Sequence, residues 1–434
     1  MSPLIIGLLG IGLLFILFLC RIPIGFAMGI VGFVGFAYLV NVDSALSMLG
    51  IVPFSTAASY ELSVIPLFVL MGYFVFYSGG SRELYDAAYK WLGKLPGSLA
   101  MASIVTAAGF SAICGSSPAT AATVGAVALP EMKRHGYEDG LAAGAVAAGG
   151  TLGIMIPPSV ILIIYGILTQ QSISKLFIAG IFPGLLLTAL FMLTIYILVQ
   201  RNPKIAPPAP SSFSFREKVI ALKSVWAFLA LFLLVIVGIY TGIFTPTEAA
   251  AVGASGAFLL AVIRRRLSRQ SFVAALVGSV VITGMIFAIL IGAWLFSCFL
   301  SVTRIPMEVA GLVVGLPVPN LAIMGTLLLI LLILGCFMDS MSVVILTMPI
   351  FFPMVVALGF DPIWFGIIVV LLVEMGLITP PVGPNVFIIS GIAKDVPMYT
   401  IFRGIVPFLI ACIVCAVILV AFPQIALFLP SLMK

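Results

Sequence analysis

Two short stretches of the chain place a double proline inside long apolar runs. The first reads GIMIPPSVIL, from Gly153 to Leu162, and the second reads GLITPPVGPN, from Gly376 to Asn385. Proline lacks an amide N–H and its ring clashes with the preceding turn, so a double proline interrupts a helix. The freed carbonyl oxygens can coordinate a hard cation such as sodium, and the N-terminus of the next half-helix attracts an anion. Each break therefore offers ligands for a cation and for an anion.

Two other apolar segments carry polar residues at their midpoints. These midpoints read CGSSPAT, from Cys114 to Thr120, and CFMDSMS, from Cys336 to Ser342. Asp339 is the most specific candidate, because an intramembrane carboxylate is costly and marks a functional site by default. It could also be a hydrated residue at the interface, and the hydroxyls could bond back to helix carbonyls. The candidates at the two midpoints and two breaks are Ser116, Ser117, Thr120, Thr151, Gly153, Pro157, Asp339, Ser340, Ser342, Gly376, Thr379 and Asn385.

Three glutamates near these elements have open roles. Glu374 precedes the second break and could be a structural partner of a basic group rather than a ligand. Glu61 and Glu248 fall in segments that we assign to the outer face, where each could contact a partner or be solvated. Glu248 could also cap the helix that follows Thr245.

The composition indicates a membrane protein. Of 434 residues, 63% are hydrophobic and only 8% are charged, and the mean hydropathy is +1.34. Apolar runs long enough to span a bilayer recur along the whole chain, which predicts an all-α polytopic protein. The basic residues cluster at short loops, so we interpret the net charge of +6 as an orientation signal and not as a nucleic-acid surface. We expect no organic cofactor.

The two halves of the chain repeat each other at a constant offset of 223 positions, which carries Pro157-Pro158 onto Pro380-Pro381 and Gly153 onto Gly376. We therefore predict a duplication. The first repeat is 1–200, with a hairpin at about 99–132 and a broken helix at about 140–168. A basic cytoplasmic linker follows at 201–223. The second repeat is 224–434, with a hairpin at about 321–354 and a broken helix at about 363–392.

The distribution of Lys and Arg predicts that the two repeats have opposite orientations. EMKRHGYED contains Lys133 and Arg134, whereas its counterpart MVVALGFDP has no basic residue. Turns with few basic residues are assigned to the outer side, and they are Asn41 to Glu61, Thr169 to Lys175, Phe244 to Glu248 and Arg304 to Asn320. The alternation holds only if each polar midpoint is the tip of a re-entrant hairpin, although one long tilted helix per segment is the alternative.

The expected fold is thus an inverted-topology repeat of about five spans plus one re-entrant hairpin each, typical of secondary transporters. Two amphipathic stretches, SRELYDAAYKWLGKL and RIPMEVAGLVVGL, precede the hairpins. Such helices lie in the interface, and we interpret them as arms between a static scaffold and a moving transport domain. Sodium is expected where each tip meets a break.

Four motifs together resemble the large membrane subunit of the tripartite ATP-independent periplasmic (TRAP) transporters. They are AICGSSPATAATVGAVALPEM, GGTLGIMIPPS, GIFTPTEAAAVGA and GLITPPVGPN, and the resemblance covers essentially the whole chain. It implies a multi-pass bacterial inner-membrane transporter of the elevator type, driven by sodium and importing an organic anion such as a C4-dicarboxylate or a sialic acid. It also implies two partners: a periplasmic substrate-binding protein and a small four-helix membrane subunit, which we expect as a separate polypeptide.

The same resemblance assigns ion and substrate binding to the tips and breaks, which here are Ser116, Ser117, Thr151, Gly153, Pro157, Asp339, Ser340, Gly376, Thr379 and Asn385. The alternatives are a self-sufficient divalent-anion/sodium symporter of the same broad fold and a gated anion channel. An intramembrane enzyme fits least, because the sequence has no H-E-x-x-H motif and no Ser/His pair.

Overall fold

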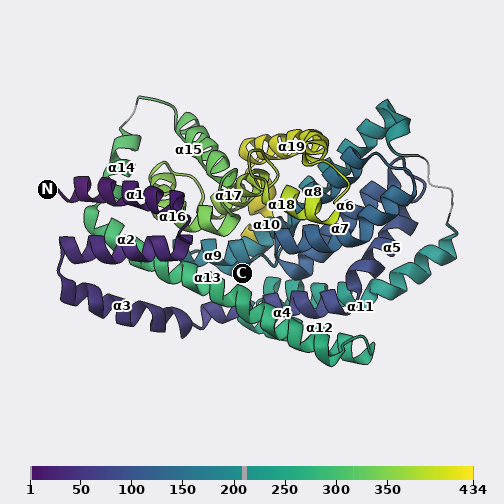
Figure 1. Cartoon of the computed structure of the whole chain (residues 1–434), viewed down its shortest axis with the longest axis horizontal. Helices are drawn as coiled ribbons and strands as arrows, with labels where there is room; N and C mark the ends of the chain where they lie inside the picture. The colour runs from purple at the N-terminus through teal and green to yellow at the C-terminus, as the bar shows by residue number, and fades with distance from the viewer. Residues whose placement is uncertain (1, 208–212, 316, 434) are drawn as a thin grey trace.

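The computed structural model describes residues 2–207, 213–315 and 317–433, whose regular elements are all helices (Figure 1). The first half contains α1 (Pro3–Leu19), α2 (Ile24–Leu39), α3 (Val42–Ala57), η1 (Glu61–Ser63), α4 (Val64–Tyr77), α5 (Gly80–Leu92), α6 (Ser98–Cys114), α7 (Ser117–Arg134), α8 (Asp139–Met155), α9 (Val160–Thr169), α10 (Ile173–Arg201) and η2 (Pro203–Ile205). The second half contains α11 (Phe215–Tyr240), α12 (Pro246–Ile263), α13 (Arg269–Thr303), α14 (Ile305–Val314), α15 (Asn320–Gly335), α16 (Ser340–Ala357), α17 (Pro362–Gly376), α18 (Pro384–Ile392), α19 (Met398–Ala421) and α20 (Gln424–Ser431).

The helix boundaries follow the internal repeat closely. A shift of 223 positions carries α7 (Ser117–Arg134) onto α16 (Ser340–Ala357) without a residue of difference at either end. The helix order is the same in both halves, except that the bent pair α3–α4 corresponds to the single long helix α13. The order and the bounds are those that a duplication would produce.

Each polar midpoint is the turn between two helices whose far ends meet. At the open end of the α15–α16 pair, the Asn320 side-chain amide donates to the carbonyl of Leu358 (3.1 Å). At the open end of the α6–α7 pair, the Leu99 amide donates to the Tyr137 hydroxyl (3.3 Å). One long tilted helix per segment would separate these atoms, so both segments are hairpins.

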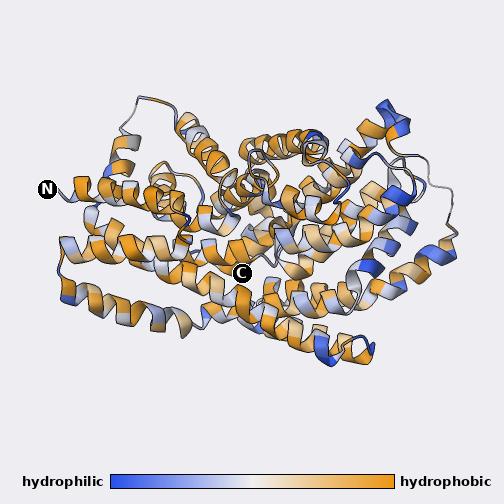
Figure 2. Ribbon diagram, viewed as in Figure 1, coloured by the Kyte–Doolittle hydropathy of each residue, from blue (hydrophilic) through white to orange (hydrophobic). Residues whose placement is uncertain are grey.

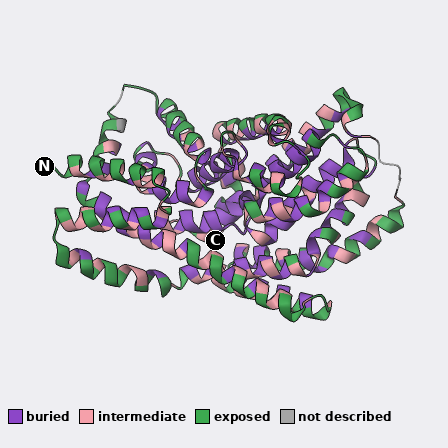
Figure 3. Cartoon of the chain, in the orientation of Figure 1, coloured by how far each residue is buried: buried purple, intermediate pink, exposed green. Residues whose placement is uncertain are grey.

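The broken helices α8–α9 and α17–α18 form the centre of the molecule. Every residue of α8 from Gly140 to Met155 is buried, and so is every residue of α17 from Ile363 to Gly376 (Figure 3). A helix that is apolar on all sides is stable only when other helices surround it. The first break, residues 156–159, is likewise buried, and α8 and α9 meet there at 40°, whereas Pro380 and Pro381 of the second break are exposed.

The outer surface is that of a membrane protein. Six single helices among the described residues are long and apolar enough to cross a bilayer, and the bent pairs α3–α4 and α8–α9 bring the number to eight. Many large hydrophobic side chains are exposed, and hydrophilic residues gather around α5, the start of α11 and the turn between α12 and α13 (Figure 2). The six helices include α16. Because α16 pairs with α15 in the second hairpin, we interpret it as the second arm of that hairpin and not as an independent span.

Two sequence interpretations need correction. The segment from Asn41 to Glu61 is not simply a turn, because its larger part is α3, a helix capped by the Asn41 side chain at the Ser44 amide (2.7 Å). Its serines, threonine and proline lower the local hydropathy without preventing a helix. The predicted linker 201–223 lies partly outside the described residues, and its last part, from Phe215, already belongs to α11.

The amphipathic helix α5 is fixed to its neighbours by charge. Glu83 forms ion pairs with Arg264 and with Arg266 (3.1 Å), which lie in the turn between α12 and α13. Arg264 also donates to the carbonyl of Ser224 in α11 (2.8 Å). On its other side, α5 contacts the first hairpin, where the Tyr85 hydroxyl donates to the carbonyl of Leu99 (3.4 Å).

Loss of the Glu83 charge should destabilise the protein more than loss of an exposed ion pair. Glu83→Gln is expected to lower the free energy of unfolding by about 1–2 kcal/mol, because two arginines lose a largely buried partner. The control is Asp395→Asn, which removes the ion pair between Asp395 and Lys133. Both of these side chains are more than half exposed. That change should cost under about 1 kcal/mol. Thermal unfolding in lipid nanodiscs measures the stability of both variants. Equal destabilisation would contradict a stabilising role of the ion pairs between Glu83 and the two arginines.

Candidate functional site

The first hairpin tip packs directly onto the first break. Gly115 has a φ of +63° and lies so close to the break that a Cβ there would be 2.6 Å from the Pro158 carbonyl oxygen. From the other side, a Cβ on Gly153 would be 2.7 Å from both the Ser116 carbonyl oxygen and the Ser117 Cα. Glycine is therefore required on both faces of this contact, since no larger residue fits between the two backbones.

The second tip meets the second break in the same way. A Cβ on Gly376 would overlap the backbone of Gly335, at the end of α15. Asp339 is the N-cap of α16 and accepts from the Ser342 amide (3.0 Å) and the Ser342 hydroxyl. Asp339 is exposed and its carboxylate accepts hydrogen bonds from its own helix, so its observed role is to cap the N-terminus of α16.

The two tips converge on Glu374, in the last turn of α17. The Ser340 hydroxyl donates to one Glu374 carboxylate oxygen (3.2 Å), and Ser117 lies beside the same carboxyl group. The Asn385 side-chain amide, from α18, donates to the Ser117 hydroxyl (2.9 Å). Ser117 and Ser340 are equivalent under the internal repeat. One carboxylate thus joins equivalent serines from the two hairpins.

Two buried oxygens of this cluster and one buried oxygen on α7 have no hydrogen-bond partner among the described residues. They are the second carboxylate oxygen of Glu374, the side-chain carbonyl of Asn385 and the hydroxyl of Thr120. Glu374 is 1% exposed, and Asn385 and Thr120 are fully buried. Because an unpaired buried polar atom is costly, these oxygens indicate a site for a ligand that the protein alone does not satisfy.

The remaining candidates shape the breaks. Thr151 and Thr379 bond back to the carbonyls of Ala148 and Met375, both at 2.6 Å, which is the structural alternative that the sequence left open. Pro157 lies in the gap between α8 and α9, and the Pro157–Pro158 and Pro380–Pro381 peptide bonds are both cis. Ser116 caps α7 by a long bond from the Ala119 amide (3.5 Å).

Glu374 is the residue whose position the sequence did not reveal. The sequence suggested a basic partner, but Glu374 forms no ion pair within the described part of the chain. The one signal in the sequence was its place two residues before Gly376, at the very break that carries the other candidates. The orientation of its side chain toward both tips depends on the tertiary contacts.

A cavity of about 280 Å³ adjoins the first tip. Ser116 and Cys114 line it at the tip, and Tyr73 and Phe76 line it from α4. Met341, next to Ser340, brings the second tip to the same cavity. Residues of α4 and of both hairpins therefore line the same cavity.

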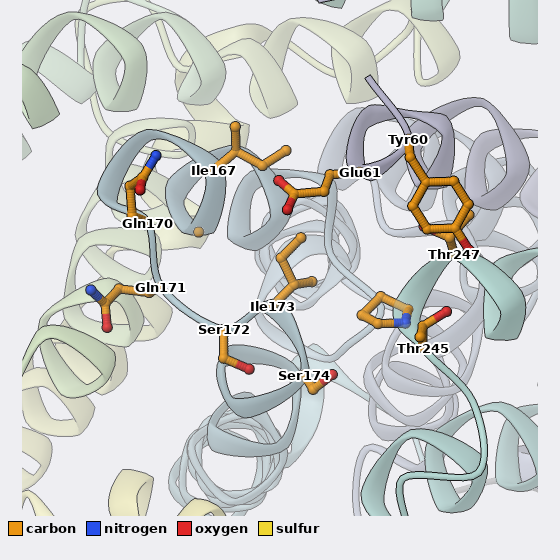
Figure 4. A pocket seen from close by; sticks show the side chains of 12 residues that line it. Tyr60, Glu61, Ile167, Gln170, Gln171, Ser172, Ile173, Ser174, Thr245 and Thr247 are labelled. Atoms are coloured by element: carbon orange, nitrogen blue, oxygen red, sulfur yellow. The ribbon is translucent and has the colours of Figure 1, made fainter. Parts of the chain in front are cut away.

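A second pocket, of about 480 Å³, lies at three of the turns predicted on the outer side (Figure 4). Tyr60 and Glu61, Gln170 and Ser172, and Thr245 line it from these three turns. Glu248 is nearby in sequence but closes a capping box with Thr245, whose amide donates to its carboxylate (2.9 Å). Of the two glutamates predicted to contact a partner, Glu61 lines this pocket.

Comparison with known proteins identifies the family. The family model for the tripartite ATP-independent periplasmic transporter, DctM component, matches residues 11–425. The chain belongs to this DctM family. It is similar to the C4-dicarboxylate TRAP transporter large permease protein DctM of Pseudomonas aeruginosa, with 40% identity over 91% of each chain. It is also similar to the sialic acid TRAP transporter large permease protein SiaM of Vibrio cholerae, with 32% identity over 97% of each chain.

Two further comparisons extend this result. The isethionate TRAP transporter permease protein DctMQ of Oleidesulfovibrio alaskensis is 37% identical over 79% of this chain and 54% of that protein. The crystal structure of the Alcanivorax borkumensis YdaH transporter has a similar fold, with a TM-score of 0.63 at 14% identity over 89% of this chain and 90% of that one. This DctM-family chain is a multi-pass permease subunit of the inner membrane and not an enzyme.

The close contact between the second tip and the second break predicts that one methyl group added at Gly376 will strongly affect stability and transport. Gly376→Ala should force the Gly335 backbone away, at a cost of about 1–3 kcal/mol, and should abolish transport by opening the second tip. Gly391→Ala, in α18, is the control, because a Cβ added there would have no atom within 4 Å. Thermal unfolding and uptake in proteoliposomes measure both variants. Normal transport by Gly376→Ala would contradict the packing argument.

Proposed function

We propose that this chain is the transporting subunit of a sodium-coupled importer for an organic anion. In this proposal, a periplasmic binding protein delivers a carboxylate such as a C4-dicarboxylate or a sialic acid, the substrate classes in the names of two relatives. The chain then moves the anion and sodium inward by an elevator movement. The observation that carries the proposal is the convergence of two hairpin tips and the second broken helix on one buried carboxylate.

The chemistry of this cluster suits a monovalent cation. Its oxygen ligands would be the Glu374 carboxylate, the hydroxyls of Ser117 and Ser340, and the Asn385 side-chain carbonyl. Hard cations prefer such oxygen ligands, whereas sulfur and imidazole ligands suit transition metals. Secondary transporters bind their coupling ions at discontinuous helices of this kind. The tips and breaks are therefore proposed to bind sodium.

The partners are assigned by where each could contact the chain. We assign the pocket at Glu61 to the periplasmic binding protein, because three turns with few basic residues form it. The small four-helix subunit would pack against exposed apolar helices, such as α13, whose most apolar window is only 22% buried. In the elevator movement, α5 would remain fixed to α11 and the α12–α13 turn while contacting the hairpin at Leu99.

Sodium-dependent uptake tests the proposal and separates it from its alternatives. The chain, reconstituted with its small subunit and binding protein, should import a carboxylate into proteoliposomes only with an inward sodium gradient. Full uptake without the binding protein and small subunit would favour a self-sufficient symporter. Uptake that continues without sodium and does not saturate would favour an anion channel. Lack of sodium-dependent uptake for every carboxylate tested would refute the proposal.

Glu374→Gln tests the central cluster separately. The amide keeps the size of the side chain but removes the charge that would attract a cation, so the sodium concentration for half-maximal uptake should rise at least about tenfold, equivalent to about 1.4 kcal/mol. Glu308→Gln is the control, because Glu308 is an exposed glutamate in the first turn of α14. An unchanged sodium dependence in Glu374→Gln would remove this residue from the site.

A further inference from the structure

The cavity beside the first tip has an unusual wall for a site that would bind a charged solute. Its polar side-chain groups, among the described residues, are the hydroxyls of Tyr73, Ser116 and Thr123 and the thiol of Cys114. The other lining residues are apolar or glycine, and no charged residue, histidine or amide side chain lies among them. The wall therefore offers few hydrogen bonds and no charge to a solute.

The cavity reaches the first hairpin tip. Ser116, the N-cap of the 18-residue helix α7, lines it there, and the central cluster of Ser117, Glu374 and Asn385 begins one residue further on. The unpartnered, fully buried Asn385 side-chain carbonyl belongs to the same cluster. A carboxylate head at this end would meet the N-terminus of α7 and a cation bound by the cluster.

The rest of the solute would face aromatic and aliphatic surface. Phe76 and Phe110 form part of the wall, and Ala119, Ala122 and Ala126 present one face of α7 to the cavity. These alanines lie three and four residues apart and so share a helix face. A second carboxylate placed here would be desolvated without a partner, and the hydroxyls of a sugar acid would lose hydrogen bonds to water.

We propose that the cavity selects a small monocarboxylate with an apolar body, and that it disfavours dicarboxylates and sialic acids. The carboxylate lies at Ser116, and the aliphatic or aryl body lies against Phe76, Phe110 and the alanine face of α7. The volume of about 280 Å³ agrees with a small solute, since sites for drug-sized ligands span about 300–1,000 Å³. This assignment rests on the proposed function and narrows its substrate class.

Binding to the complex of this chain with its small subunit tests the assignment. Calorimetry in nanodiscs, in sodium or in choline, would compare isocaproate and phenylacetate with succinate and N-acetylneuraminate. In sodium, isocaproate or phenylacetate should bind about tenfold more tightly than succinate and N-acetylneuraminate do. A tenfold difference in affinity is about 1.4 kcal/mol, and burying an unpaired charge costs more than that.

Two variants locate the solute body. Ala122→Asn puts an amide on the cavity wall and should weaken binding of the preferred acid about tenfold, through lost apolar contact. Ala108→Asn is the matched control, because Ala108 is also half-buried in this hairpin but does not line the cavity. Phe76→Arg brings a guanidinium to the wall and should shift the preference toward succinate.

The outcomes separate this inference from the proposed function. If succinate or N-acetylneuraminate binds most tightly in sodium, the inference is wrong and the proposed function stands. If Ala122→Asn and Ala108→Asn have equal effects, the cavity does not hold the solute body and the inference is also wrong. If none of the four acids shows sodium-dependent binding and no carboxylate is taken up in the transport assay, the proposed function fails and this inference fails with it.

Discussion

A helix that is interrupted inside a membrane must find protein partners for the backbone groups that it frees, because the bilayer core offers no water. This constraint accounts for the arrangement of the hairpins. Each tip presses on a break so closely that Gly153 and Gly376 admit no side chain. The fully buried helices α8 and α17 then place the first break and Glu374 inside the protein, where the apolar surroundings make every remaining polar atom significant.

The repeat is symmetrical in its backbone but not in its chemistry. Ser117 and Ser340 are equivalent, and both lie at Glu374. The equivalent of Glu374 in the first half is Thr151, which bonds back to its own helix. Two carboxylates at the meeting point of the tips would repel each other in a low dielectric. The duplicated scaffold therefore provides two tips for a single charged centre.

The sequence predicted the framework well because hydropathy, proline and glycine report directly on local backbone. The hairpin expected at about 321–354 is α15–α16, Asn320 to Ala357, and the first broken helix differs from its expected bounds by one residue at each end. Side-chain roles were less predictable, because polarity indicates membrane depth but not direction. Asp339 and Glu374 are both carboxylates near a break, yet one caps its own helix and the other joins the two hairpins.

The lack of a basic partner for Glu374 among the described residues affects how the binding of sodium and of the anion would be coupled. No basic side chain pairs with it among the described residues, and none lines the neighbouring cavity. An ionised Glu374 and a carboxylate at Ser116 would repel each other, and in this apolar interior the repulsion is screened little. A cation at the cluster would convert that repulsion into attraction on both sides. Coupling then needs no separate gate, because the anion has no favourable site until the cation is in place.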